Sequence, residues 1–188
     1  MSKTTLHPPR STFPDDTALD AAAEALTGVT LLDAADLAWA SLTSLAEGDR
    51  SDTVVHHRAI VLLALQLKPV RDWLLVQAVD HEDVSLACIR ELVWLVAKAP
   101  QPLQAPAAGA TAMLLIAVTD SAPAARFHAD LGGNDTLALL VGEVLAAQLP
   151  GEQVRSMLRE AKPVVRKVLE DASQASIPAA VVARGVGE

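Results

Sequence analysis

Aromatic residues, cysteine and cationic residues are scarce in this sequence of 188 residues. Three Trp, two Phe and no Tyr leave little surface on which nucleobases could stack, and 23 Asp and Glu against 15 Lys and Arg give a net charge of −8. Because base stacking and phosphate neutralisation drive nucleic-acid binding, we do not expect a nucleic acid as a partner. The single Cys88 cannot close an intramolecular disulfide, so no oxidising compartment is implied and we expect the chain to be cytoplasmic.

The sequence also lacks a long uninterrupted hydrophobic run. Its first 15 residues contain only Leu6 and Phe13 as large apolar groups, which excludes the apolar stretch of a secretory signal. The longest uncharged stretch in the middle of the chain, 100–119, is broken by three prolines and a glycine, and its dense apolar part is shorter than the ~20 residues that span a bilayer. We therefore expect no membrane segment.

Apolar residues make up 51% of the chain and recur at helical spacing, whereas no alternating strand pattern of useful length is present. This pattern predicts an all-α fold, a bundle of eight to ten short antiparallel helices packed as TPR-like helical hairpins. Pro163 is expected to kink or split the last helix. Asp16, Asp33 and Asp80 are predicted to cap helices that end near residues 26, 47 and 99, and Ser51 or Asp52 to open a helix that Pro69 ends. The other predicted helices cover residues 70–79, 107–118, 123–131, 135–148 and 151–171.

Proline and glycine punctuation predicts the domain organisation. Residues 1–15 are expected to form a flexible lead-in and residues 16–172 a single helical domain. Within that domain a Pro-rich connector, 100–106, should separate two helical halves because proline interrupts helical hydrogen bonding. The Ser-, Ala- and Gly-rich residues 173–188 are expected to form a mobile tail.

Clusters of ligand-type residues have an ordinary structural interpretation. Asp80, His81, Glu82 and Asp83 lack the i, i+3 or i+4 spacing of a helical metal site, and acidic residues at a helix start cap it and oppose its dipole. The adjacent His56 and His57 point about 100° apart on a helix. His128, near Arg126 and Asp130, is expected at the surface, and Cys88 in the core. We therefore expect no metal and no cofactor.

Trp94 is the first residue that stands out, because it lies in the polar stripe of its helix between Arg90 and Lys98. A tryptophan among charges is either covered by another segment of the same chain or exposed as an interface anchor. The sequence leaves both alternatives open.

The second feature is a basic band in the last helix. Arg155, Arg159, Lys162 and Arg166 follow at i, i+4, i+7 and i+11, which reverses the sign of the charge locally in an acidic chain. The band could flank acidic helices of the same chain or be solvated, dock an acidic partner, or bind nucleic acid. The acidic composition and the few aromatics argue against the last of these.

Several short segments resemble the C-terminal helical region of the DUF4192 family, a mainly actinobacterial group without an assigned function. Leu67 to Leu75, with its Val70-Arg71-Asp72 element, is similar to the helix start of that family, and Leu92 to Pro100 is similar to its Leu-Trp and Ala-Pro stretch. Residues 105–108, 124–127, 137–140 and 149–152 add shorter likenesses. The resemblance implies TPR-like helical hairpins and a cytoplasmic role, and it carries no catalytic residues.

These features favour a non-enzymatic helical module for protein–protein interaction, an adaptor or regulator that could also dimerise. The alternative is an enzyme or small-molecule binder with a pocket between the two helical halves, in which Arg71, Asp72, His81 and Arg126 would converge. Residues 177–182 could form a short docking peptide or a frayed end.

Overall fold

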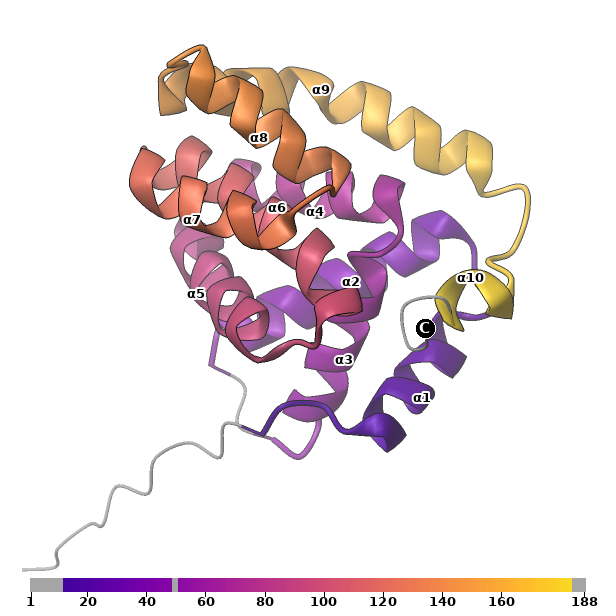
Figure 1. Ribbon diagram of the computed structural model, residues 1–188. Coiled ribbons are helices and arrows are strands. Elements are labelled where there is room, and N and C mark those ends of the chain that lie inside the picture. The colour runs from indigo at the N-terminus through magenta and orange to yellow at the C-terminus, as the bar shows by residue number, and fades with distance from the viewer. Residues whose placement is uncertain (1–11, 49–50, 184–188) are drawn as a thin grey trace, which may run out of the picture.

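The computed structural model describes residues 12–48 and 51–183, and these contain ten helices and no strand (Figure 1). The predicted all-α bundle is therefore confirmed. The helices are α1 (Asp16–Leu26), α2 (Leu31–Ala46), α3 (Val54–Ala64), α4 (Lys68–Asp80), α5 (Glu82–Lys98), α6 (Gln101–Thr119), α7 (Ala122–Gly132), α8 (Thr136–Ala146), α9 (Gly151–Ala172) and α10 (Ala179–Ala183).

Long buried runs in three helices form the centre of the bundle. Residues 59–64 of α3, 73–79 of α4 and 107–117 of α6 are buried without interruption. A helix that has no polar face has to be surrounded by other helices, and α6 accordingly packs against α5, α7, α8 and α9. The more amphipathic helices lie on the outside of this centre.

The Pro-rich segment 100–106 is helical and does not act as a connector. Helix α6 begins at Gln101, with Pro102 in the first turn, where the missing amide hydrogen would have no helical partner. Pro106 lies inside the helix and removes one hydrogen bond, yet the twelve buried residues that follow or surround it hold the helix in place. Because α9 packs against α2 and α4, the chain does not divide into two halves at this point.

Helix α6 is long and apolar enough to cross a membrane by length and composition, and it is the one such helix among the described residues. The prolines that were expected to interrupt this stretch do not do so. In this fold 67% of the most apolar 18-residue stretch of α6 is buried inside the bundle, so the helix forms part of the core.

Both ends of the described chain pack more closely than predicted. Residues 1–11 of the expected lead-in lie outside the described residues, but Pro14 is buried, Phe13 is half-buried and Asp15 caps α1. At the other end Ile177 exchanges backbone hydrogen bonds of 3.0 and 2.9 Å with Gly28 and Val29.

The predicted mobile tail, 173–188, is therefore wrong for residues 173–182. Ile177 and Val182 are buried, α10 packs against α1, and the Ser173 hydroxyl accepts a hydrogen bond from Leu32 N at the start of α2. The apolar side chains at 177 and 182 gain more from burial than the short segment loses in freedom. Residues 184–188 lie outside the described residues.

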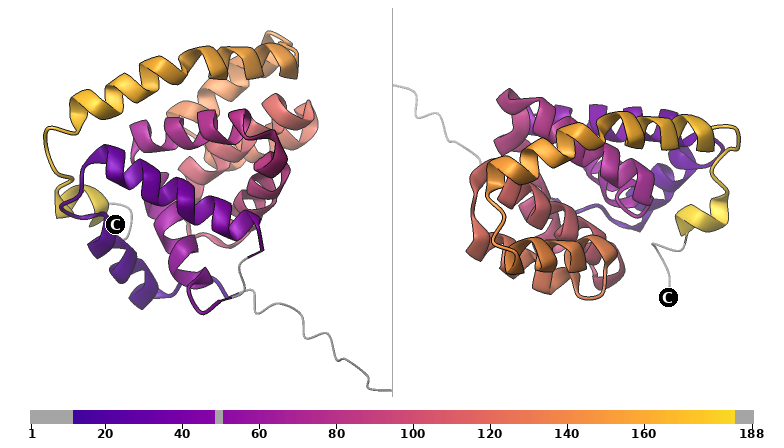
Figure 2. Two further views of the ribbon diagram at one scale, coloured as in Figure 1. Left: turned by 180° about the vertical axis from the view of Figure 1, so that it is seen from behind. Right: turned by 90° about the horizontal axis from the view of Figure 1, so that it is seen from above.

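Helices α8 and α9 diverge from their short connection as two arms (Figure 2). Helix α8 packs against α6 and α7, whereas α9 packs against α4, α6 and α2, and in the described structure the two arms hardly touch one another. Pro163 does not split α9, which runs unbroken from Gly151 to Ala172. Its ring lies on the exposed side, where water can reach the carbonyl group that lost its helical donor.

Candidate functional site

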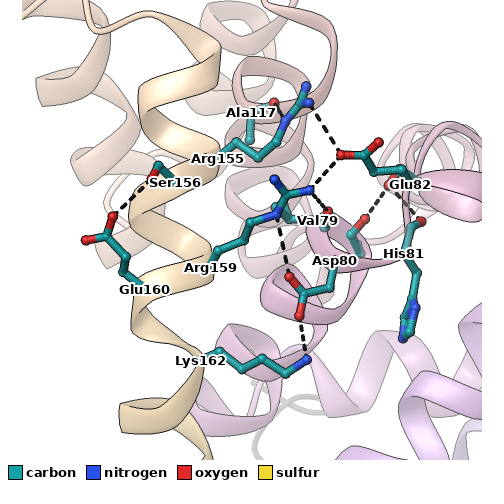
Figure 3. Close-up of polar contacts among 12 residues, drawn as sticks. Val79, Asp80, His81, Glu82, Ala117, Arg155, Ser156, Arg159, Glu160 and Lys162 are labelled. Atoms are coloured by element: carbon teal, nitrogen blue, oxygen red, sulfur yellow. Dashed lines mark hydrogen bonds and ion pairs between the residues drawn. The ribbon is translucent and has the colours of Figure 1, made fainter.

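The basic band of α9 faces the junction between α4 and α5 (Figure 3). Arg159 lies 2.6 Å from the Glu82 carboxylate and 3.6 Å from that of Asp80, and Lys162 also pairs with Asp80. Arg155 lies 3.8 Å from Glu82. Three of the four cations of the basic band are thus paired with acidic residues at the junction of α4 and α5.

The same arginines also bind the ends of two helices. Arg155 Nε donates to the carbonyl oxygen of Ala117 at 2.9 Å in the last turn of α6, and Arg159 Nη2 lies 3.4 Å from the carbonyl oxygen of Val79 in the last turn of α4. These carbonyl groups carry the negative end of the helix dipole, which favours a nearby cation. Arg155, Arg159 and Lys162 therefore hold α9 against the bundle, and we call their contacts with α4, α5 and α6 the α9 seam.

Two predictions about this junction need correction. Asp80 was expected to cap α5, but His81 occupies the N-cap position without a side-chain hydrogen bond and Asp80 pairs with Lys162 and Arg159. Arg166 does not join the seam, because it is exposed and pairs along α9 with Glu170 at 2.8 Å. Three residues of the basic band therefore form the α9 seam, and the fourth, Arg166, faces solvent.

A polar groove of about 530 Å³ runs beside this seam between the end of α6 and the start of α9. Asp120, in the left-handed conformation with φ 52°, accepts a 2.9 Å hydrogen bond from Gly151 N. Arg155 and Arg159 line the groove, but their charges already face Glu82 and Asp80. Ser156 also lines the groove, and its hydroxyl donates a 3.0 Å hydrogen bond to the carboxylate of Glu160, one turn further along α9. Both side chains are exposed, and they lie on the side of α9 away from the ion pairs with Asp80 and Glu82 (Figure 3).

Trp94 is half-buried, and side chains of its own chain cover part of its indole ring. The guanidinium carbon of Arg58 lies 3.9 Å from the centroid of the indole ring, and the centroid of the Phe13 ring lies 6.4 Å from that of Trp94. Arg58 is itself buried and reaches Glu91 at 3.3 Å. These contacts support the interpretation of Trp94 as a packed residue, while its helix neighbours Arg90 and Lys98 are exposed.

The polar residues suggested for a pocket between two halves lie in different places. His81 stacks on Trp39 with ring centroids 5.3 Å apart, and Arg126 is exposed on α7. Only Arg71 and Asp72, neighbours on α4, come together. The structure does not bring the four side chains to one cavity.

Arg71 belongs instead to a buried ion pair that the sequence did not indicate. Its Nη1 atom lies 3.1 and 3.0 Å from the two carboxylate oxygens of Asp135, and the residue is only 4% exposed. Asp135 also caps α8 by accepting a 2.9 Å hydrogen bond from Leu137 N. Burial raises the pKa of the neighbouring Asp72, against the opposing effect of Arg71.

No group of three His, Cys, Asp or Glu side chains within the described ranges is placed to hold a metal ion. Cys88 is buried, and this burial raises the pKa of its thiol to about 12. Since the thiolate is the reactive form of cysteine, this side chain is chemically inert at neutral pH.

His128 is buried, although the sequence favoured a surface position. It lies on the inner face of α7, its ring meets Phe127 edge-on at 5.4 Å, and its Nδ1 atom is buried without a hydrogen-bond partner. Desolvation therefore lowers the pKa of this imidazole. As the pH falls, the unfolded chain takes up a proton on this residue before the folded chain does.

We expect the stability that His128 contributes to be complete above a pH of about 6.5 and to decline as the pH falls below it. Urea unfolding at pH 7.5 and pH 5.5 should show a smaller pH-dependent loss for His128→Leu than for the natural chain. The matched change His81→Leu, at an exposed histidine, should leave that loss in place. An equal reduction by both substitutions would contradict the assignment.

Most of the large apolar side chains that are exposed in the described structure belong to the two arms, and the sequence analysis did not predict them. Leu139 and Leu140 of α8 are 55% and 46% exposed, and Met157, Val164 and Val168 of α9 are 52%, 63% and 46% exposed. Met157 and Val168 recur at helical spacing with Val154 and Leu169 and could have been taken for core residues, but they lie away from these two buried residues on α9. Two features of the sequence could have predicted these exposed residues. The segment that forms α8 has one charged residue, and Met157, Ala161, Val164 and Val168 follow one another at i, i+4, i+7 and i+11.

Comparison of the chain with known protein families, with characterised proteins and with solved structures finds no match.

Proposed function

We propose that this protein is a non-enzymatic helical module that binds another protein through the exposed apolar side chains of α8 and α9. The single observation that carries this proposal is their grouping. Five of the eight large apolar residues that are exposed in the described structure belong to these two arms. Exposed large apolar side chains that gather on neighbouring elements, unlike ones scattered singly over a surface, are typical of protein interfaces.

The distribution of charged groups supports the same proposal. The cations of the α9 seam are paired with acidic residues of the same chain. The polar side chains that could have formed a pocket lie in different places, as the stacking of His81 on Trp39 shows. We continue to expect a cytoplasmic protein without a membrane segment. The resemblance to the DUF4192 family, and the TPR-like packing that it implies, also remain proposals.

Site-specific photo-crosslinking tests the interaction. A benzophenone amino acid is placed at Leu140 or at Val164 in the full chain, which is then irradiated in the cells that produce it. We expect discrete protein adducts from both positions. The matched positions are Leu86 of α5 and Phe127 of α7, which are 55% and 61% exposed and lie outside the two arms. Absence of adducts, or the same adducts from all four positions, would contradict the proposal.

A further inference from the structure

A groove of about 420 Å³ lies where the start of α4 meets the outer side of α8. We call it the α4–α8 groove. Its apolar wall comes from α8 and its polar edge from α4 and α8, and it is lined by Arg71, Asp72, Thr136, Leu137, Leu139, Leu140 and Glu143. It is thus continuous with the exposed leucines on which the proposed function rests.

The exposed apolar side chains of α9 lie on one flank of the helix. Met157, Val164 and Val168 lie on the flank of α9 opposite the basic band, and the band faces the junction of α4 and α5. Helices α8 and α9 diverge from their short connection (Figure 2, right) and hardly touch in the described structure, and the residues that line the α4–α8 groove come from α4 and α8.

The charge around the groove is negative. Asp72 has a side chain that is 46% exposed and Glu143 is exposed, whereas the guanidinium of Arg71 is buried and already bonded to Asp135. Nε of Arg71 also lies 3.6 Å from the Asp72 carboxylate, which leaves Glu143 as the unpaired acidic side chain of the lining. Two exposed cations lie near these surfaces, Lys68 one turn before Asp72 on α4 and Lys167 beside Val168 on α9, where Asp171 follows one turn later. Because its desolvated carboxylate already has a raised pKa, Asp72 would gain from a further cation.

We propose that the α4–α8 groove receives an amphipathic helix of a partner protein that carries Lys or Arg beside its apolar stripe, and that the exposed apolar flank of α9 extends this docking surface. The inference rests on the proposed function and specifies its partner. An apolar helix face fits into such a groove at i, i+3, i+4 and i+7 spacing, and basic residues beside it would meet Asp72 and Glu143. A second copy of this chain fits less well, because two molecules of net charge −8 would meet at acidic edges.

Two synthetic peptides test the chemistry of the partner. Both have leucine at i, i+3, i+4 and i+7 and a length of about 18 residues, because shorter isolated helices are marginal in water. One carries lysine and the other glutamate at the flanking positions. Fluorescence anisotropy of each labelled peptide with the full-length protein should show binding of the lysine peptide alone, weakening as salt increases.

Substitutions then locate the binding. Leu140→Glu and Val164→Glu should each weaken binding of the lysine peptide at least about tenfold, whereas Phe127→Glu, at an exposed apolar residue outside the groove, should not. Glu143→Gln should weaken it by about two- to fivefold and reduce its salt dependence, while Glu24→Gln on α1 should do neither. Circular dichroism and the unfolding midpoint of each variant separate a lost contact from a lost fold.

Three results would overturn the inference: equal binding of the two peptides, binding that Leu140→Glu leaves unchanged, or a dimer in light scattering that Leu140→Glu dissociates. The crosslinking experiment keeps the two proposals apart. Protein adducts at Leu140 without binding of the lysine peptide would retain the proposed function and reject the basic helix as the partner. Absence of both would reject both proposals.

Discussion

Replacing Asp135 with alanine is expected to lower the free energy of unfolding by about 3–5 kcal/mol, because it removes the main hydrogen-bonding partner of a buried charge. Nη1 of the Arg71 guanidinium lies 3.1 and 3.0 Å from the two carboxylate oxygens of Asp135, and the other carboxylate beside Arg71 is the half-exposed Asp72, 3.6 Å from Nε. The same substitution removes the cap of α8, since Leu137 N donates to this carboxylate at 2.9 Å. Chemical denaturation monitored by circular dichroism measures the change.

Asp15→Ala provides the matched control for the capping contribution. Asp15 caps α1 through a 2.9 Å hydrogen bond from Ala18 N and is exposed, so its loss should cost only about 1 kcal/mol.

A double variant isolates the buried charge. Asp135→Ser keeps a capping side chain but removes the carboxylate, and adding Arg71→Met should recover most of the lost stability because no buried charge then remains. A loss from Asp135→Ala no larger than that from Asp15→Ala would refute this account of the ion pair.

Gly151→Ala is expected to destabilise the protein by about 2–3 kcal/mol, although alanine is the better helix former. A β-carbon at this position would overlap the carbonyl oxygen of Ile116 and come within 2.9 Å of the Asp120 carboxylate. The first turn of α9 would have to move away from the end of α6, which would also disturb the contact between Arg155 and Ala117. Thermal unfolding followed at 222 nm measures the loss.

Gly142→Ala on α8 is the matched control, because nothing lies within 4 Å of a β-carbon at that exposed position. There the helix propensity of alanine should act alone and stabilise the protein by about 0.5–1 kcal/mol. The two substitutions are therefore expected to have opposite signs. A stabilising effect at Gly151 would show that α9 does not pack on α6 as closely as described.

The helices that the sequence located best are those with a continuous apolar pattern and clear punctuation. The helix predicted to begin at Asp16 and to end near residue 26 matches α1 to within one residue, and the predicted 123–131 and 135–148 segments differ from α7 and α8 by one or two residues at each end. These boundaries depend on local signals such as Asp135 as a cap and Gly133 as a stop, which act within one turn of helix. Pro106 was misjudged because the burial of α6, a property of the whole bundle, outweighs one missing hydrogen bond.

The contacts of the basic band could be predicted only in part from the sequence. The spacing of Arg155, Arg159 and Lys162 correctly placed three cations on one flank of a helix, but it could not show that Asp80 and Glu82 lie opposite them. The two carboxylates are more than seventy positions away along the chain. The sequence therefore left open whether the band faces its own chain or a partner.

From its sequence alone this protein is committed to an all-α fold, because its apolar side chains recur with the period of a helix and each helix forms through contacts between neighbours in the chain. Only the tertiary structure decided which flank of each helix is covered. It turned the cations of α9 inward onto Asp80 and Glu82, covered Trp94 with Arg58, and left Leu140 and Val164 exposed. Burial depends on the direction in which distant helices pack, and a helical period by itself does not specify that direction.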